Sequence, residues 1–123
     1  MPLVIFVDDS ETALASTRMV TDTMPIEVKQ YLNAADALQE IKGGLAPDLI
    51  ITDMNMPVMN GFEFLQELRR FPGTARTPVL MLTTETRDDI KQQGKALGLT
   101  GWIVKPFNPA QLKQAIGRVL RLA

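Results

Sequence analysis

The stretch Leu3-Val4-Ile5-Phe6-Val7-Asp8-Asp9 decides the fold, because five apolar residues run directly into two acids that a buried strand could not hold. Three further strand-like runs end on polar side chains: residues 49–52 on Asp53, residues 79–82 on Thr83 and Thr84, and residues 102–104 on Lys105. If these runs are parallel strands of one sheet, their ends meet along one edge, where α/β proteins place ligand sites. Three carboxylates, an ammonium and a hydroxyl would then share one crevice. This indicates a site for a divalent cation and a phosphoryl group.

The rest of the chain alternates short apolar runs with helical patterns, which predicts βα units and a parallel sheet with right-handed crossovers. The expected strands cover about residues 3–7, 26–32, 49–53, 79–82 and 101–104. The expected helices cover about residues 10–24, a short stretch from Asn33 or Asp36 to Gly43, a stretch with Phe62, Leu65 and Leu68 on its apolar face, residues 87–97, and a last stretch from Pro109. No repeat or linker-like change of composition interrupts this pattern. We therefore expect one α/β domain over residues 1–123.

Composition narrows the chemistry. The chain has no histidine and no cysteine, so a bound metal must be held by oxygen atoms, which favours magnesium, manganese or calcium. Any phosphohistidine must come from a partner. No apolar stretch approaches the roughly 20 residues that span a bilayer, and Met1-Pro2-Leu3 lacks the basic region of a signal peptide. We expect a cytoplasmic protein without membrane insertion.

The charges are divided unevenly along the chain. Residues 1–61 carry nine acids and three bases, whereas residues 62–123 carry five acids and ten bases. The second half would offer a moderately basic face to an acidic partner. Nucleic acid is not expected as a partner, because the bases are scattered and few aromatic residues lie among them.

The acids at the strand ends also have an ordinary explanation, since Asp often follows a strand and caps the next helix. The adjacency of Asp8 and Asp9 argues for more, because neighbouring carboxylates repel unless a cation or base lies between them. A hard cation with oxygen ligands removes that conflict. Asp53 follows an apolar and hence central strand, and its carboxylate can bind metal or attack phosphorus to give an acyl phosphate.

Lys105, Thr83 and Trp102 each allow two interpretations. Lys105 could place its charge in solvent at the rim of the sheet; beside Asp53 it becomes a point charge for the aspartate and then for a phosphate. Thr83 could be a plain β-branched strand residue, or its hydroxyl could reach a phosphoryl oxygen on Asp53 and so form a bond only in the modified state. Trp102, the sole tryptophan, is either a core or rim residue or a movable reporter of state.

Together these residues resemble the receiver domain of bacterial two-component response regulators, over essentially the whole chain. The resemblance rests on five features in the family's order and approximate spacing: Asp8-Asp9, Asp53, Thr83, Lys105-Pro106-Phe107, and the loop Met54-Asn55-Met56-Pro57-Val58-Met59-Asn60-Gly61. Each feature is weak alone, but the five in order are highly specific.

The resemblance implies a doubly wound, five-stranded parallel sheet of strand order 2-1-3-4-5, the flavodoxin-like receiver fold. It implies that Asp53 is the phosphoacceptor and that Lys105 contacts the phosphate. Mg²⁺, with Mn²⁺ as an alternative, would be held by Asp9, Asp53 and the backbone carbonyl of Asn55, and by Asp8 through water. The Lys105–Pro106 bond would be cis.

The resemblance also implies a signalling module rather than an enzyme, one that catalyses its own phosphotransfer and dephosphorylation. A histidine kinase would supply the phosphoryl group. Thr83 and Trp102 would act as the switch that remodels the face formed by residues 87–97, residues 101–104 and the helix from Pro109, where a downstream protein binds.

The absence of an output domain points to stand-alone receivers of the chemotaxis, CheY-like, type. Asn55 and Glu85 match that subgroup at positions that modulate dephosphorylation. The flagellar motor switch and a phosphatase are then candidate partners. Two positions depart from the family: Trp102, where tyrosine or phenylalanine is more usual, and Met54, where chemotaxis receivers often have an aromatic residue.

Two other classes of protein fit parts of the pattern. A magnesium-dependent hydrolase with an aspartyl nucleophile usually has its two carboxylates two positions apart after the first strand, whereas Asp8 and Asp9 are adjacent, and the chain has no residues to spare for a cap. A flavodoxin-like cofactor binder needs a phosphate-cradling loop after the first strand, where this chain has acids instead.

Overall fold

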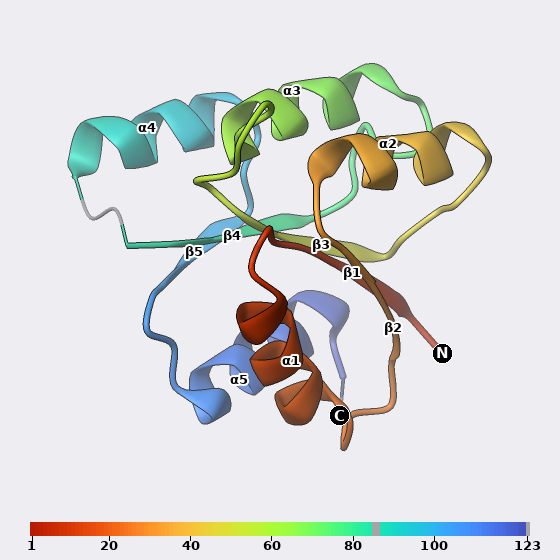
Figure 1. Cartoon of the computed structure of the whole chain (residues 1–123), viewed down its shortest axis with the longest axis vertical. Coiled ribbons are helices and arrows are strands. Elements are labelled where there is room, and N and C mark those ends of the chain that lie inside the picture. The colour runs from red at the N-terminus through yellow and green to blue at the C-terminus, as the bar shows by residue number, and fades with distance from the viewer. Residues whose placement is uncertain (85–86, 123) are drawn as a thin grey trace.

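The computed structural model of the chain describes residues 1–84 and 87–122. Within them five strands alternate with five helices (Figure 1). The strands are β1 (Leu3–Val7), β2 (Glu27–Tyr31), β3 (Leu49–Asp53), β4 (Val79–Thr83) and β5 (Gly101–Val104). The helices are α1 (Glu11–Thr21), α2 (Ala34–Lys42), α3 (Gly61–Arg70), α4 (Asp88–Ala96) and α5 (Pro109–Leu120). None of the described helices is long and apolar enough to cross a membrane.

The strands form one parallel sheet in the order β2-β1-β3-β4-β5. This confirms the doubly wound, flavodoxin-like fold that the sequence predicts. The register pairs Asp53 with Leu82 and Thr83 with Val104. Because parallel strands all run in the same direction, the residues that end them lie along one edge of the sheet. That edge carries the polar side chains on which the apolar runs end.

Helices cover both faces of the sheet, with α1 and α5 on one side and α2, α3 and α4 on the other (Figure 1). Alternate residues of the central strands pack toward opposite sides: Val4 and Ile51 toward α1 and α5, Ile5 and Ile50 toward α2 and α3. All five residues of β3 are buried. A strand buried on both faces reads as a continuous apolar run, which is why this segment could be located from sequence.

Two predicted boundaries were too wide. The first helix ends at Thr21 rather than near Met24, because the Met24 amide donates to the Thr21 carbonyl in a tight turn (2.9 Å). The second strand covers only Glu27–Tyr31. It begins late because the Ile26 amide donates to the Met24 carbonyl (2.8 Å) and so belongs to the turn.

The predicted apolar face of α3 was wrong in one member. Phe64, Leu65 and Leu68 are fully buried, whereas Phe62 is only half-buried. Phe62 instead packs edge-to-face on Trp102, with ring centroids 5.9 Å apart. The helix therefore uses one side for the core and another for contact with β5.

Arg69 ties two loops together at the opposite edge of the sheet from the polar strand ends. Its guanidinium donates to the carbonyl oxygens of Thr74 (2.9 Å) and Thr77 (2.8 Å), which precede β4, and to that of Gly98 (2.9 Å), which follows α4. The C-terminal end of α3 is thereby fixed to the segment that connects α4 with β5.

Candidate functional site

Three carboxylates meet at the polar edge of the sheet. Asp8 and Asp9 follow β1 and Asp53 ends β3, and one oxygen of each lies within 4.8 Å of the others. Asp8 and Asp53 are buried, whereas Asp9 is exposed. Acids from two strands that are distant in the sequence therefore converge, as the apolar runs that they end predict.

Asp8 is oriented by the start of α1. One of its carboxylate oxygens accepts a hydrogen bond from the Ser10 amide (2.9 Å). The Ser10 hydroxyl in turn accepts from the Ala13 amide (3.1 Å) and caps the helix. The Asp-Asp-Ser sequence thus ends a strand, places a carboxylate and begins a helix within three residues.

Lys105 reaches into the acidic cluster from the end of β5. Its Nζ lies 3.3 Å from the Asp8 carboxylate and 3.2 Å from that of Asp53. The Lys105 amide donates to the Thr83 carbonyl (2.9 Å), which continues the strand pairing up to the site. The Lys105–Pro106 peptide bond is cis.

The electrostatics of the pocket are unbalanced. Burial raises the pKa of the Asp53 carboxyl; Lys105 opposes that rise and Asp8 adds to it, leaving the pKa above its ordinary value. Burial works to lower the pKa of Lys105, but attraction to Asp8 and Asp53 outweighs it, and the pKa is raised. One ammonium faces three carboxylates. A divalent cation would offset the remaining negative charge, and carboxylate oxygens are the ligands that Mg²⁺ prefers.

The loop between β3 and α3 is closed tightly at its base. The Met54 amide donates to the Leu82 carbonyl (3.1 Å), and the Gly61 amide donates to the Met54 carbonyl (2.8 Å). A Cβ atom at Gly61 would lie 2.8 Å from the Asp53 carbonyl oxygen, so only glycine fits there. Asn60 begins α3 with a reciprocal capping box to Glu63. These bonds fix the backbone on both sides of the loop.

Thr83 lies at the same edge, at the end of β4, and is buried. Its hydroxyl lies 3.7 Å from the Met54 sulfur, a weak acceptor. No pattern in the sequence predicts this contact. The hydroxyl belongs to the strand that pairs with the strand of Asp53; its role as a switch stays a prediction.

Trp102 belongs to β5 and is half-buried against two helices, α3 and α4. Its ring contacts Phe62 of α3, and a Cβ atom at Gly94 of α4 would lie 2.7 Å from it. The ring therefore packs directly against the backbone of α4. Trp102 is not part of the acidic cluster, which leaves its role as a switch a prediction.

Two remaining predicted residues have different outcomes. Asn55 is exposed and its backbone N–H donates to Asp53; its carbonyl as a metal ligand stays a prediction. Glu85 lies outside the described residues.

A family model described as the response regulator receiver domain matches residues 4–117. The chain belongs to this family. The receiver domain is a phosphorylation-controlled signalling module rather than a classical enzyme, and the pocket of Asp8, Asp9 and Asp53 is its acidic site.

Several known proteins resemble this receiver domain in sequence or structure. It is similar to the chemotaxis protein CheY4 of Vibrio cholerae, with a TM-score of 0.91 and 43% identity over 97% of this chain and 98% of that one. It is 31% identical over 97% of its length to the cyclic di-GMP phosphodiesterase response regulator RpfG of Xanthomonas campestris, but it spans only 32% of that relative. The receiver domain of the sensor histidine kinase PA1611 from Pseudomonas aeruginosa, with magnesium in its active-site cleft, shares the fold (TM-score 0.87, 19% identity, 98% of both chains).

The contacts that four residues make around the site were not predicted from sequence: those of Met54, Gly61, Phe62 and Gly94. The two glycines carried a signal, because Asn-Gly marks a turn and a glycine inside a helical pattern often has a packing reason. Met54 and Phe62 carried none, since their contacts depend on how separate elements pack.

Proposed function

We propose that this receiver domain, acting as one domain over residues 1–123, accepts a phosphoryl group on Asp53 from the phosphohistidine of a histidine kinase. The observation that carries the proposal is the Asp53 carboxylate itself, buried at the end of the central strand, 3.2 Å from the Lys105 ammonium and within reach of two more carboxylates.

In the transfer, a carboxylate oxygen of Asp53 attacks phosphorus in line with the bond to the donor imidazole. The new P–O bond forms as the P–N bond breaks, and the electron pair of the P–N bond returns to the imidazole nitrogen. Asp53 becomes an acyl phosphate. Lys105 is already in place to neutralise one of the negative charges that the phosphoryl group brings into the pocket.

Asp8, Asp9 and Asp53, with the backbone carbonyl of Asn55, would hold Mg²⁺, or Mn²⁺ in its place. The donor set fits a hard cation, because it consists of oxygens alone and carries more negative charge than Lys105 balances. When bound, the cation supplies charge neutralisation at the phosphoryl oxygens. Asn55 and Glu85 would modulate the later attack of water, through which the domain dephosphorylates itself.

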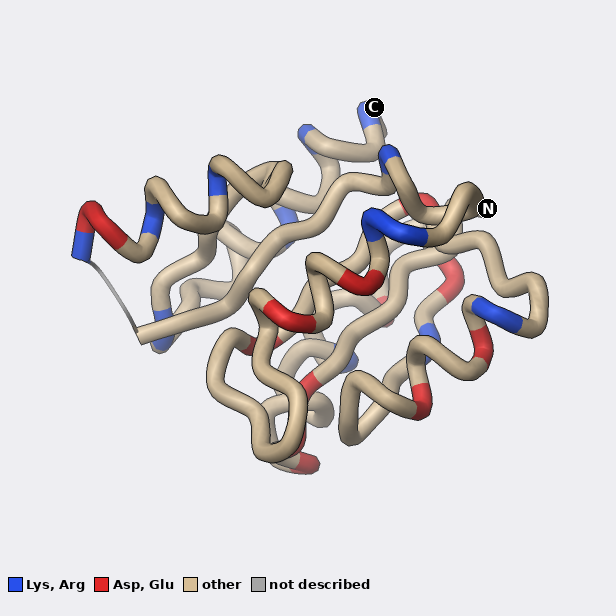
Figure 2. The backbone as a smooth tube through the Cα atoms, turned by 90° about the horizontal axis from the view of Figure 1, so that it is seen from above, with Lys and Arg blue, Asp and Glu red and all other residues tan. Residues whose placement is uncertain are grey.

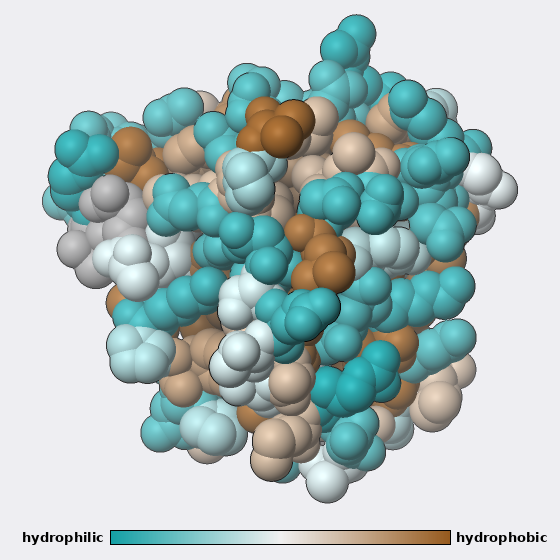
Figure 3. Space-filling model, viewed as in Figure 1, coloured by the Kyte–Doolittle hydropathy of each residue, from teal (hydrophilic) through white to brown (hydrophobic). Residues whose placement is uncertain are grey.

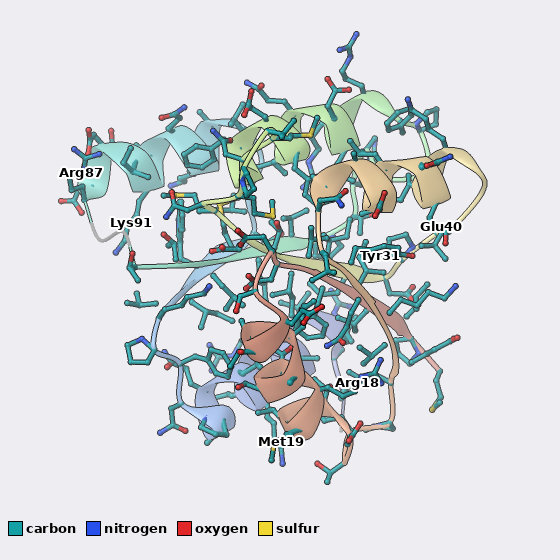
Figure 4. All side chains as sticks on the ribbon, viewed as in Figure 1. Arg18, Met19, Tyr31, Glu40, Arg87 and Lys91 are labelled. Atoms are coloured by element: carbon teal, nitrogen blue, oxygen red, sulfur yellow. The ribbon has the colours of Figure 1, made fainter. Side chains whose placement is uncertain are left out.

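The response to phosphorylation would pass through Thr83 and Trp102 to the face formed by α4, β5 and α5. The Thr83 hydroxyl would turn from the Met54 sulfur toward the phosphate, and Trp102 would follow. A groove between α4 and β5 is lined by Asp88, Lys91, Lys95 and Trp102 among others, so that two ammonium groups face one carboxylate there. Figure 2 shows basic positions along α4 together with acidic ones at its start, and Figure 4 labels Arg87, which precedes the helix, and Lys91, which lies on it. An acidic protein segment would fit this face.

The pathway is proposed as chemotaxis, because the likeness to CheY4 covers nearly the whole length of both chains. The downstream target would then be the flagellar motor switch, and a phosphatase would be a second partner. A kinase donor of this kind implies a cytoplasmic location.

The test is incubation of the protein with Mg²⁺ and acetyl phosphate, followed by intact-mass measurement. We expect one added phosphate on the wild-type protein and none on Asp53→Asn. Chelation of Mg²⁺ should abolish the modification. Steady turnover of diverse phosphoesters, without a trapped phosphate, would instead indicate the hydrolase and contradict the proposal.

A further inference from the structure

Met54 lies between the proposed phosphoacceptor and the proposed switch. It follows Asp53 directly, and its backbone is fixed on both sides. Its amide donates to the Leu82 carbonyl (3.1 Å), and its carbonyl accepts from the Gly61 amide (2.8 Å). Because Leu82 pairs with Asp53 across β3 and β4, the first of these bonds carries the strand pairing one residue past the site. The Met54 side chain therefore starts from a fixed point beside the end of β4.

The sulfur of Met54 contacts the Thr83 hydroxyl. The two atoms, Sδ and Oγ1, are 3.7 Å apart, and a thioether sulfur is only a weak acceptor. Thr83 is 1% exposed, so its hydroxyl finds partners within the protein rather than in bulk water. A stronger acceptor on Met54 would therefore hold this hydroxyl more firmly than the sulfur does.

Oxidation of the sulfur would supply such an acceptor. The chain has seven methionines and no cysteine, so its thioethers are the sulfur atoms that a peroxide can oxidise. Met56 and Met81 are buried, whereas Met54 is half-buried and open in part to solvent. Figure 3 shows hydrophobic atoms at the surface in the upper part of the molecule, where Figure 1 draws the loop that Met54 begins. A sulfoxide replaces the apolar thioether with a polar group whose oxygen accepts hydrogen bonds.

The remaining methionines lie away from this hydroxyl. Met1 precedes β1 and is exposed. Met19 is exposed about two turns into α1, and Figure 4 labels it toward the far end of that helix. Met24 and Met59 are half-buried and pack against the two apolar cores. Within the described residues, Met54 is thus the methionine at which oxidation would reach the proposed switch.

We propose that Met54 is a redox modification site, at which a peroxide forms a sulfoxide that holds the Thr83 hydroxyl and so opposes the response to phosphorylation of Asp53. A lone pair of the sulfur attacks one peroxide oxygen, and the S–O bond forms as the O–O bond breaks. With hydrogen peroxide, the leaving hydroxide takes the proton of the transferred hydroxyl and departs as water. The sulfur loses two electrons and the peroxide gains them. The inference rests on the proposed function, because it needs Thr83 to turn toward a phosphoryl group.

The first measurement asks whether Met54 reacts. The wild-type protein and Met54→Leu are treated with hydrogen peroxide, and peptide mass spectrometry gives the oxidised fraction at each methionine. We expect oxidation of Met54 at peroxide levels that leave Met56 and Met81 intact. If Met54 stays reduced while Met59, which is also half-buried, becomes oxidised, the inference is overturned.

The second measurement asks what the sulfoxide does. Beryllofluoride with Mg²⁺ serves as the phosphoryl analogue, and isothermal titration calorimetry gives its dissociation constant before and after oxidation. Oxidation should weaken binding to the wild-type protein about fivefold, the change expected from one competing hydrogen bond. Methionine sulfoxide reductases with a thiol reductant should restore the original dissociation constant.

Met54→Leu is the matched control, because leucine keeps the volume but removes the sulfur. The variant retains the other six of the seven methionines, so it reports what their oxidation does. Peroxide should change its dissociation constant less than about twofold. Equal weakening in the wild-type protein and in Met54→Leu would assign the effect to another methionine and overturn the inference.

Thr83→Val tests the partner of the sulfoxide, since valine keeps the shape of threonine without the hydroxyl. This variant should bind beryllofluoride more weakly from the start, but oxidation should weaken its binding by less than about a further twofold. A further fivefold loss would mean that the sulfoxide does not act through the hydroxyl. Loss of the circular dichroism signal on oxidation of the wild-type protein would also overturn the inference, because the sulfoxide would then unfold the domain.

Failure of the two proposals is distinguishable. If acetyl phosphate does not modify Asp53 in the untreated wild-type protein, the proposed function fails. If acetyl phosphate modifies Asp53 but oxidation of Met54 leaves the dissociation constant of beryllofluoride unchanged, the redox site is overturned while the phosphoacceptor stands.

Discussion

Helices α3 and α4 lie side by side on the same face of the sheet (Figure 1), yet they are held in place by different means. α3 begins with a reciprocal capping box at Asn60 and buries three large apolar side chains completely. α4 has no side-chain cap hydrogen bond at Arg87, and Gly94 is its one buried residue among those described. The first helix is part of the core, whereas the second rests on it.

This contrast shows which of the two helices can move with the smaller loss of stability. Moving α3 would expose apolar side chains that are now fully buried, whereas moving α4 would chiefly disturb the contact of Gly94 with Trp102 and Phe62. Regions with few buried apolar contacts are the ones that open most easily. Since α4 follows Thr83 in the chain, the less firmly held helix is the one nearest to the proposed switch.

The largest expected difference concerns buried side chains. Leu68→Ala in α3 should lower the free energy of unfolding by about 3 kcal/mol, because it leaves a cavity in the core. Ile90→Ala in α4 should lower it by about 1 kcal/mol or less, because Ile90 is only half-buried. Urea denaturation followed by circular dichroism measures both. Similar losses in the two variants would contradict the comparison.

Gly94→Ala tests the contact between α4 and Trp102. Alanine favours the helix by about 1 kcal/mol, but its Cβ atom would lie 2.7 Å from the Trp102 ring and 3.0 Å from Leu99. We expect a net loss of about 1–2 kcal/mol and a shift of Trp102 fluorescence.

Gly117→Ala in α5 is the matched control, because no atom outside its own helix lies within 4 Å of the added Cβ. This variant should gain about 0.5–1 kcal/mol with unchanged emission. A higher free energy of unfolding in both variants would show that α4 can move away from Trp102 at no cost, and that the contact with the ring does not hold the helix in place.

The helix caps provide the third test. Asn60→Ala removes the capping box and should cost about 1 kcal/mol. Arg87→Ser would add a capping hydroxyl to α4 and should gain up to about 1 kcal/mol. Thermal unfolding gives both values, and amide hydrogen exchange shows whether the gain is confined to α4. A loss in Arg87→Ser would mean that the arginine itself stabilises the start of the helix.

The smallest expected effect lies in the acidic pocket of Asp8, Asp9 and Asp53. Burial raises the pKa of Asp53, so the folded protein binds a proton more readily than the unfolded chain, and ionised Asp53 lowers stability as pH rises from about 4 upward. Asp53→Asn should therefore gain about 1 kcal/mol or less at pH 7. The gain should vanish below about pH 4, where the carboxyl is protonated in both states. Thermal midpoints across this range measure it, and a gain that grows toward low pH would reverse the assignment.

The fold was predictable where apolar runs are continuous. All five residues of β3 are buried, so its continuous apolar sequence predicts a central strand. The acids at the ends of β1 and β3 indicate the edge of the sheet on which the site lies. Boundaries such as those of α1 and β2 were not predictable to the residue, because they depend on turn hydrogen bonds of Met24 and Ile26.

The site was predictable as a set of polar strand ends, but its surroundings were not. Asp8, Asp53 and Lys105 follow from strand pattern and parallel direction alone. The packing of Phe62 on Trp102 and the contact of Thr83 with Met54 arise between elements, so no local pattern encodes them. The positive φ of Val58 could not be predicted for another reason, because a β-branched residue rarely adopts that backbone conformation.

The three hydrogen bonds of Arg69 have a mechanical consequence for α4. Because one of them holds Gly98 just beyond the C-terminal end of the helix, that end acts as a pivot and the opposite end sweeps the widest arc. The nine residues of α4 form a lever about 13 Å long, so a tilt of about 10° carries its N-terminal end roughly 2 Å. A movement too slight to disturb the anchor is thereby enlarged at the N-terminal end of the helix, which is the end that follows Thr83 in the chain.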